Sequence, residues 1–135
     1  MSILVNKEAP NFTAQAVMPN GVMESLSLDQ FRGHYVVLFF WPLDFTFVCP
    51  TEIIAHNKRV AAFEERDVQL IGCSIDSQFT HAAWRNTPVD KGGIGEVNFP
   101  AGEVPHLEVL TSEVTIPREA MGFGDVKFMA AIGAF

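Results

Sequence analysis

Two mostly apolar runs, YVVLFFW at residues 35–41 and VQLIGCSI at residues 68–75, constrain the fold of this chain more than any other feature. Neither run alternates regularly between polar and apolar residues, which is typical of strands covered on both faces. Between them, Thr51 to about Glu65 has helical spacing, with apolar residues near one face at Ile53, Ile54, Val60, Ala61 and Phe63. Strand, helix and strand in this order predict a βαβ unit with parallel strands, and therefore an α/β fold.

Turn and capping residues predict the elements before this unit. Pro19-Asn20-Gly21 lies between two modest runs, and Asn-Gly is a strong hairpin signal, so we expect a hairpin over Ala9 to Met23. Ser27 and Gln30 have the spacing of a capping box at the start of a short helix. Gly33 is placed to end that helix in a left-handed conformation.

The elements after the unit are predicted less sharply. Asp76 or Ser77 can cap a helix from Gln78 to about Asn86. Beyond residue 100 the pattern weakens: Leu107 to Ile116 fits one strand, and Gly124 to Phe135 fits another strand or a short helix. With 135 residues the chain is long enough for one domain and one core.

The composition narrows the class of protein. Apolar residues make up 48% of the chain, charged residues 19%, and the net charge is −7. This acidity argues against a nucleic-acid backbone or an anionic membrane as partner. No apolar stretch reaches the roughly 18 residues that a membrane span needs, and the first residues do not resemble a secretory signal. We therefore expect a soluble, cytoplasmic protein.

The two cysteines, Cys49 and Cys73, are too few for a disulfide framework, and no His/Cys cluster has the spacing of a zinc site. Cys49 directly precedes Pro50, a residue that fits the first turn of a helix. A helix N-terminus carries about half a positive charge and free N–H groups, which favour a thiolate. This end of a βαβ unit also lies at the carboxyl edge of the strands, where open sheets place their sites.

Each cysteine has an inert interpretation as well as a reactive one. Most cysteines are small buried hydrophobes, so position alone leaves Cys49 open to either reading. Cys73 lies in the middle of an apolar strand and is expected to belong to the core. The histidines are scattered, and His56 is expected to face away from the helix start, so the sequence supports no Cys-His-Asp hydrolase site.

The residues around Cys49 suggest supporting roles. Thr46 can direct its hydroxyl at the sulfur, because a hydroxyl both donates and accepts hydrogen bonds. Pro42, Phe45 and Phe47 are expected to shield the site from water. Glu52 in the first helical turn is typical of a residue that stabilises the helix dipole, and it can also orient an arginine.

At this point the sequence resembles a known family. PLDFTFVC at residues 42–49 contains Pro-x-x-x-Thr-x-x-Cys, the motif of the peroxiredoxins. Pro50-Thr51-Glu52 follows, as in the bacterial alkyl hydroperoxide reductase peroxidase subunit and its two-cysteine relatives. The resemblance extends over about residues 3–100 and includes the segments APNF, GCSIDS, HAAWRNTP and GGIG.

The resemblance implies a thioredoxin-like fold: α/β, with a central mixed sheet flanked by helices and the N-terminal hairpin as an extension. It implies a thiol peroxidase that reduces hydrogen peroxide and organic hydroperoxides. Cys49 would be the peroxidatic cysteine, cycling through a sulfenic acid. Thr46 would hydrogen-bond peroxide and thiolate, Pro42 would shield the sulfenate, and Glu52 would help to position an arginine.

The resemblance further implies that no metal or organic cofactor is used. Thioredoxin or a flavoprotein disulfide reductase would be the electron donor, and the chain would form a homodimer or a larger homo-oligomer, with antioxidant defence as its role. The loop at Gly92 to Gly95 resembles the one that favours overoxidation in sensitive relatives.

After Pro100 the sequence departs from the family pattern. A resolving cysteine and the family's later active-site arginine are not visible, and Arg118 is the only arginine in the last 35 residues. We therefore expect a single domain, residues 1–135, that is incomplete at its C-terminal end. A non-catalytic redox sensor or chaperone-like binder, or an inert fragment, remains the alternative to a peroxidase.

Overall fold

The computed structural model describes residues 6–103 and 129–132. Its strands form one six-stranded mixed sheet in the order β2-β1-β5-β4-β3-β6. The strands are β1 (Thr13–Val17), β2 (Met23–Ser27), β3 (Tyr35–Phe40), β4 (Val68–Ser74), β5 (Ala101–Glu103) and β6 (Met129–Ile132). The helices are η1 (Leu28–Phe31), α1 (Cys49–Asn57), α2 (Val60–Glu64), α3 (Gln78–Arg85) and η2 (Val89–Lys91), of which η1 and η2 are 3₁₀ turns.

The predicted βαβ unit is confirmed. β3 pairs in parallel with β4, in a register that runs from Tyr35 opposite Val68 to Phe40 opposite Cys73. The helix predicted between them begins where Cys49-Pro50 indicated, but it is not a single helix, because it is divided into α1 and α2. The division follows Asn57, whose side chain donates to the Glu96 carbonyl at 3.0 Å and accepts from the Asn98 N–H at 2.7 Å. Asparagine is a weak helix former, and these bonds attach the end of α1 to residues 96–98.

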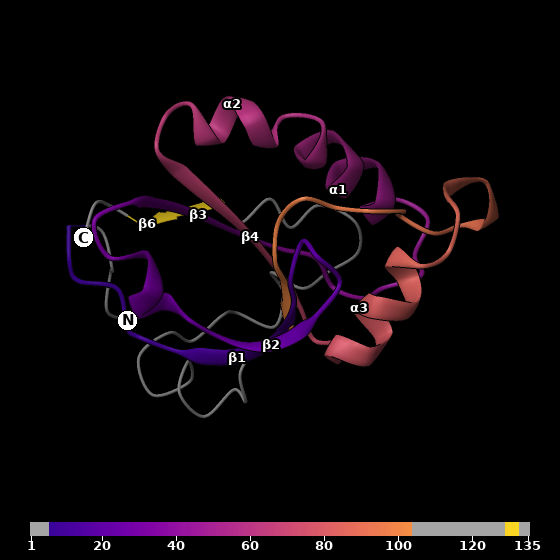
Figure 1. Ribbon diagram of the computed structural model, residues 1–135, viewed down its shortest axis with the longest axis horizontal. Coiled ribbons are helices and arrows are strands. Elements are labelled where there is room, and N and C mark those ends of the chain that lie inside the picture. The colour runs from indigo at the N-terminus through magenta and orange to yellow at the C-terminus, as the bar shows by residue number, and fades with distance from the viewer. Residues whose placement is uncertain (1–5, 104–128, 133–135) are drawn as a thin grey trace, which may run out of the picture.

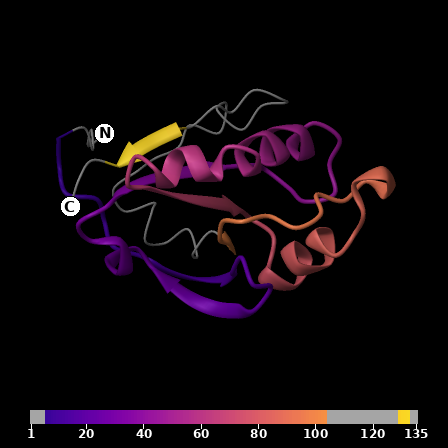
Figure 2. The ribbon, with the colours of Figure 1, turned by 45° about the horizontal axis from the view of Figure 1, so that its top comes forward.

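Both faces of the central strands are covered, as the continuous apolar runs predicted. Phe39 and Leu70 belong to a core cluster that includes α1, α2 and Trp84 of α3. The neighbouring Leu38 and Ile71 belong to a second cluster with apolar residues of the hairpin and η1. In Figures 1 and 2 the helices α1 and α2 lie on one side of β4 and the β1–β2 hairpin lies on the other. The alternation places successive strand residues in different clusters.

The N-terminal hairpin is confirmed, although its second strand runs on to Ser27 beyond the predicted end. β5, which was not predicted, joins the hairpin to the rest of the sheet: it pairs antiparallel with β1 and parallel with β4. β6 pairs antiparallel with β3, so the strand alternative for Gly124 to Phe135 is the one observed over its described residues. The expected strand at Leu107 to Ile116 and the arginine Arg118 lie outside the described residues.

The predicted caps are largely confirmed. Gln30 accepts the Ser27 N–H at 3.4 Å, and Gly33 has the left-handed φ of 92° that was expected after η1. Of the two candidate caps for α3, Ser77 is the one used, since its hydroxyl accepts the Thr80 N–H at 3.4 Å. Asp76 has a different role, described below.

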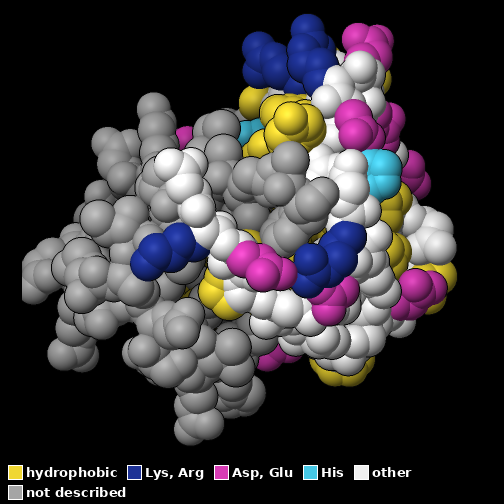
Figure 3. Space-filling model, turned by 90° about the vertical axis from the view of Figure 1, so that its left-hand side faces the viewer, with side chains coloured by type: hydrophobic (Ala, Val, Ile, Leu, Met, Phe, Trp, Pro, Cys, Tyr) yellow, Lys and Arg dark blue, Asp and Glu magenta, His cyan; other side chains and the backbone are white. Residues whose placement is uncertain are grey.

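The described helices include none that is long and apolar enough to cross a membrane. On the face shown in Figure 3, the coloured Lys and Arg side chains lie beside Asp and Glu side chains. Among the described residues, Arg32 forms ion pairs with Asp29 at 2.9 Å and with Glu8 at 3.3 Å. The basic side chains visible there are therefore interspersed with acidic ones.

Candidate active site

Cys49 is the first residue of α1, so the predicted position at a helix N-terminus is confirmed. Val48 occupies the cap position and has no side-chain oxygen, and Pro50 lies in the first turn. The helix dipole is therefore not offset by a capping side chain at this end. Cys49 is half-buried and packs against the core cluster that contains α1 and α3. This combination of partial exposure and fixed packing suits a reactive thiol.

Cys73 has the opposite environment, as predicted. It is 2% exposed and is the second-last residue of β4. Burial raises the pKa of its thiol to about 12, an effect opposed by a hydrogen bond with the Gly102 backbone. The thiol therefore stays protonated at neutral pH and is shielded from reagents in the folded chain.

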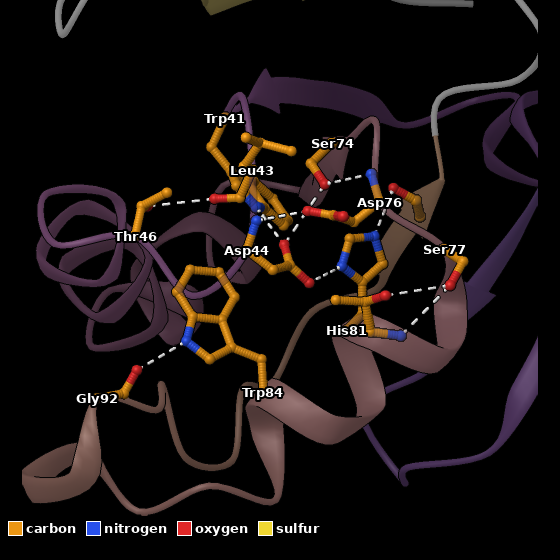
Figure 4. Close-up of polar contacts among 12 residues, drawn as sticks. Trp41, Leu43, Asp44, Thr46, Ser74, Asp76, Ser77, His81, Trp84 and Gly92 are labelled. Carbon is orange, nitrogen blue, oxygen red and sulfur yellow. Dashed lines mark hydrogen bonds and ion pairs between the residues drawn. The ribbon is translucent and has the colours of Figure 1, made fainter.

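Thr46 is half-buried three residues before Cys49. Its hydroxyl donates to the Leu43 carbonyl oxygen at 3.2 Å, as Figure 4 shows. Because the single hydroxyl hydrogen is used there, the oxygen keeps lone pairs that can accept from another donor. The structure thus gives Thr46 a defined orientation, while its predicted contact with the sulfur stays a prediction.

Pro42 and Glu52 are both exposed. Within the described residues no ion pair joins Glu52 to an arginine, so its predicted orienting role stays a prediction. The expected shielding by Phe47 is wrong for a single chain, because its side chain is 97% exposed. Phe45 packs at 5.8 Å from the ring of Trp84 and remains 49% exposed.

The side chain of His56 contacts Glu52 and Phe39, which agrees with the prediction that it faces away from the start of the helix. Its Nδ1 lies 2.8 Å from the carbonyl oxygen of Glu52, one turn back in α1. Its ring stacks on Phe39 at a centroid distance of 4.4 Å. The histidine closest in sequence to Cys49 is therefore placed as part of the packing of α1.

A buried polar network beside the site was not predicted from the sequence. Asp44 and His81 are 7% and 1% exposed, and Asp44 Oδ2 lies 2.5 Å from His81 Nδ1. Trp41 Nε1 donates to Asp44 Oδ1 at 2.7 Å, and Asp76 accepts the Asp44 N–H at 2.6 Å. Figure 4 shows these side chains converging from the loop after β3, the turn after β4 and α3. His81 shares a helix face with the buried Trp84, and this spacing was the one sequence signal for its burial.

α3 also holds the loops on its other sides. Arg85 is 7% exposed and donates to the carbonyl oxygens of Met18 at 2.6 Å and Pro19 at 2.9 Å. Burial lowers the pKa of its guanidinium, and the charge of Glu96 acts in the opposite direction. Trp84 Nε1 donates to the Gly92 carbonyl at 2.9 Å. α3 therefore connects the hairpin turn and the glycine-rich loop to the region of Cys49.

The glycine-rich loop has one position where only glycine fits. A Cβ added at Gly93 would lie 1.8 Å from the Thr87 carbonyl oxygen. Gly92 adds a left-handed φ of 85° at the end of η2. This close approach lets the loop pack against the end of α3, where the Ile94 N–H meets the Trp84 carbonyl at 3.3 Å.

Comparisons with known proteins agree with this geometry. The model of the AhpC/TSA family matches residues 5–106. Peroxiredoxin-1 of Gallus gallus is 53% identical over 96 residues, which cover 71% of this chain and 48% of that protein. Alkyl hydroperoxide reductase C of Helicobacter pylori is 58% identical over 100 residues, covering 73% of this chain and 50% of that one. The chain thus spans about half the length of the curated relatives it matches.

Solved structures share the fold. The crystal structure of reduced Plasmodium vivax 2-Cys peroxiredoxin superposes with a TM-score of 0.80 at 44% identity, covering 87% of this chain and 62% of that one. The α/β arrangement with a mixed sheet flanked by helices is therefore the thioredoxin-like fold that the resemblance implied. On the strength of the family model and these relatives, the chain belongs to the AhpC/TSA family.

Proposed function

We propose that this chain is a thiol peroxidase in which Cys49 reduces hydrogen peroxide and organic hydroperoxides. The observation that carries the proposal is the contrast between its two cysteines. Cys49 begins α1 half-buried, with an uncapped helix N-terminus around it, whereas Cys73 is sealed in β4. Reactive cysteines occupy partly exposed sites with positive potential, and buried structural ones do not react.

The proposed reaction begins with the Cys49 thiolate. Its sulfur attacks one peroxide oxygen, the O–O bond breaks, and the second oxygen leaves as water or an alcohol after taking a proton. The sulfur is oxidised by two electrons to a sulfenic acid. Thr46 is proposed to accept a hydrogen bond from the peroxide, since its own hydrogen is held by Leu43. Pro42 is proposed to shield the sulfenate, and Glu52 to position an arginine.

The return of Cys49 to the thiol needs two electrons from outside this chain. Its only other cysteine, Cys73, is enclosed in the core. We propose an external dithiol protein, thioredoxin or a flavoprotein disulfide reductase, as donor. Its first thiol displaces water to form a mixed disulfide with Cys49, and its second thiol breaks that disulfide. Restoration of turnover by one such donor, followed as peroxide loss, tests this step.

The experiment for the whole proposal is intact-mass measurement after one equivalent of hydrogen peroxide in the presence of a sulfenic-acid trap, followed by peptide mapping. We expect one rapid adduct, on Cys49, and none in Cys49→Ser. Cys73→Ser should behave as the wild type. Slow labelling of both cysteines alike, or peroxide consumption that survives in Cys49→Ser, would remove Cys49 from the chemistry.

A second function is favoured by the same enclosed Cys73. Without a resolving thiol in these 135 residues, oxidised Cys49 has no internal partner, which suits a redox sensor that passes its oxidation to another protein. Peroxide consumption in the presence of excess dithiol reductant separates the two. Many turnovers per chain identify the peroxidase, and a single equivalent consumed identifies the sensor.

We further propose a cytoplasmic location and self-association into a homodimer or larger homo-oligomer. The reducing cytoplasm suits a cysteine that must return to the thiol in each cycle. A Plasmodium yoelii relative with 43% identity and a TM-score of 0.76 is described as forming an artifactual octamer when modified at its N-terminus. Cell fractionation tests the location, and sedimentation velocity tests the assembly, with a purely monomeric species contradicting it.

A further inference from the structure

Asp44 has an unusual place in the segment that leads to Cys49. The residues from 42 to 48, called here the 42–48 segment, are exposed or half-buried with this single exception. Asp44 is 7% exposed, whereas its neighbours Leu43 and Phe45 are 46% and 49% exposed. A carboxylate is rarely buried unless its charge and lone pairs are matched. The segment is therefore attached to the core through an acidic side chain.

The contacts of Asp44 come from several parts of the chain. Its Oδ1 accepts from Trp41 Nε1, just after β3, at 2.7 Å, and from the hydroxyl of Ser74, the last residue of β4, at 3.4 Å. Its Oδ2 meets His81 Nδ1 of α3 at 2.5 Å. Its backbone N–H donates to Asp76 Oδ2 at 2.6 Å. Both carboxylate oxygens and the backbone donor are thus occupied, as Figure 4 shows.

His81 is itself held from both sides. Its Nε2 lies 3.2 Å from the carbonyl oxygen of Gly102 in β5. A carbonyl oxygen can only accept, so Nε2 carries the hydrogen of that bond, and one further hydrogen lies between Nδ1 and Asp44. The imidazole ring cannot rotate without breaking one of these bonds. Asp44 is consequently fixed to a rigid partner, because networks of satisfied buried groups specify one arrangement.

The residue after Asp44 depends on this attachment. Phe45 has a left-handed φ of 53°, a conformation that is costly for an aromatic residue and persists only where its surroundings enforce it. On one side Asp44 is fixed in the network, and on the other the Thr46 hydroxyl returns to the Leu43 carbonyl at 3.2 Å. The left-handed residue Phe45 therefore joins the buried Asp44 to Thr46.

We propose that Asp44 is a positioning residue for the peroxide chemistry of Cys49. It does not touch the sulfur; it fixes the 42–48 segment so that Thr46 and Cys49 present a correct geometry to the peroxide. This inference rests on the proposed peroxidase function and goes beyond the roles of Cys49, Thr46, Pro42 and Glu52. It gives the buried Asp44–His81 pair a part in the reaction, in addition to its part in stability.

The test compares two reactions of the same thiol in the full chain. Peroxide attack requires aligned groups, whereas alkylation by iodoacetamide needs only an accessible thiolate. Asp44→Ala should slow Cys49 oxidation by hydrogen peroxide roughly ten- to a hundredfold, the loss typical of misplaced reacting groups, while alkylation is not slowed in parallel. Equal rates to wild type in both reactions, or an equal fall in both, would overturn the proposal.

Asp44→Asn provides the conservative rescue. Its amide oxygen can accept from Trp41, and its amide nitrogen can donate to an unprotonated Nδ1 of His81, so the anchor is kept without the charge. We expect oxidation by peroxide to recover most of the wild-type rate. An Asn variant as slow as Asp44→Ala, with an unchanged melting transition, would contradict a geometric role.

Two variants keep the test decisive. If Asp44→Ala does not melt cooperatively, Trp41→Phe removes one donor to Asp44 while keeping an aromatic ring, and a smaller loss confined to the peroxide reaction is expected. Asp67→Asn, which breaks the exposed His34–Asp67 pair, is the matched control and should leave both rates unchanged.

A wild-type Cys49 that shows no preference for peroxide over iodoacetamide would refute the peroxidase proposal and this inference with it. If wild-type Cys49 prefers peroxide over iodoacetamide and Asp44→Ala keeps the same preference, the inference alone is refuted and the peroxidase proposal stands.

Discussion

A histidine–aspartate pair lies near each end of the parallel strands β3 and β4. The two pairs have similar nitrogen–oxygen distances but very different exposure to water. His34 and Asp67, just before the two strands, lie 2.6 Å apart with side chains 56% and 61% exposed. Asp44 and His81, beyond the carboxyl ends, lie 2.5 Å apart with side chains 0% and 1% exposed. The distance between a histidine and an aspartate therefore says little about what their pair does.

Burial and further bonding make the difference. Water surrounds the exposed pair, and such pairs contribute about 0–1 kcal/mol. The buried pair is cut off from water and is matched by Trp41, Ser74 and Gly102. Breaking a pair of this kind leaves an uncompensated buried group, which costs about 3–5 kcal/mol. The proposed chemistry lies at the same end as the buried pair.

The largest effect should come from removing one histidine of each pair. His81→Ala should lower the free energy of unfolding by about 3–5 kcal/mol, because it leaves Asp44 buried without its principal partner. His34→Ala, the matched variant, should lower it by less than about 1 kcal/mol. Urea unfolding at neutral pH measures both values. Equal losses of unfolding free energy in the two variants would contradict the claim that burial makes the Asp44–His81 pair the more stabilising one.

A smaller effect is expected on reactivity. Thr46→Val keeps the shape of the side chain and removes its hydroxyl, so Cys49 oxidation by peroxide should slow about tenfold, or about 1.4 kcal/mol of transition-state stabilisation. Rapid-mixing measurement of sulfenate formation gives the rate, with His34→Gln as the control at the opposite end of the strands. An unchanged rate in Thr46→Val would take this residue out of the mechanism.

The last effect, absent at neutral pH, is a dependence of stability on alkaline pH that tests the burial of Cys73 by itself. Burial raises the pKa of Cys73 to about 12 in the folded chain, above its ordinary value of 9.0. Between these values the unfolded chain loses the thiol proton while the folded chain keeps it. The resulting stability, full below about pH 9, should fall by up to about 1.4 kcal/mol per pH unit as the pH rises toward 12.

Cys73→Ala should remove this part of the pH dependence. Because other groups titrate in the same range, the quantity to compare is the difference in unfolding free energy between wild type and variant at pH 8 and at about pH 10. A difference that does not change with pH would show that Cys73 titrates alike in both states, and that its enclosure is looser than that of the Asp44–His81 pair.

Local patterns were sufficient for the elements that carry the site. The apolar runs, the Ser27–Gln30 spacing and the Cys49-Pro50 pair each depend on neighbours in sequence, and the strands, the cap and the helix start were found where these patterns indicated. The helix break after Asn57 was not predicted, and the side chain at this point bonds a segment about 40 residues away, at Glu96 and Asn98.

The sequence by itself determined the βαβ unit, the hairpin and the position of Cys49 at the start of a helix, because periodicity, turn residues and proline act over a few residues. Tertiary structure alone decided that Asp44 would be anchored on His81, 37 residues away, and that Arg85 would hold the hairpin turn, 67 residues away. It also decided that β5 would join the hairpin to the sheet. A polar residue in a loop and a histidine in a helix have no local signature of burial, since their partners are brought to them only when the strands and helices pack.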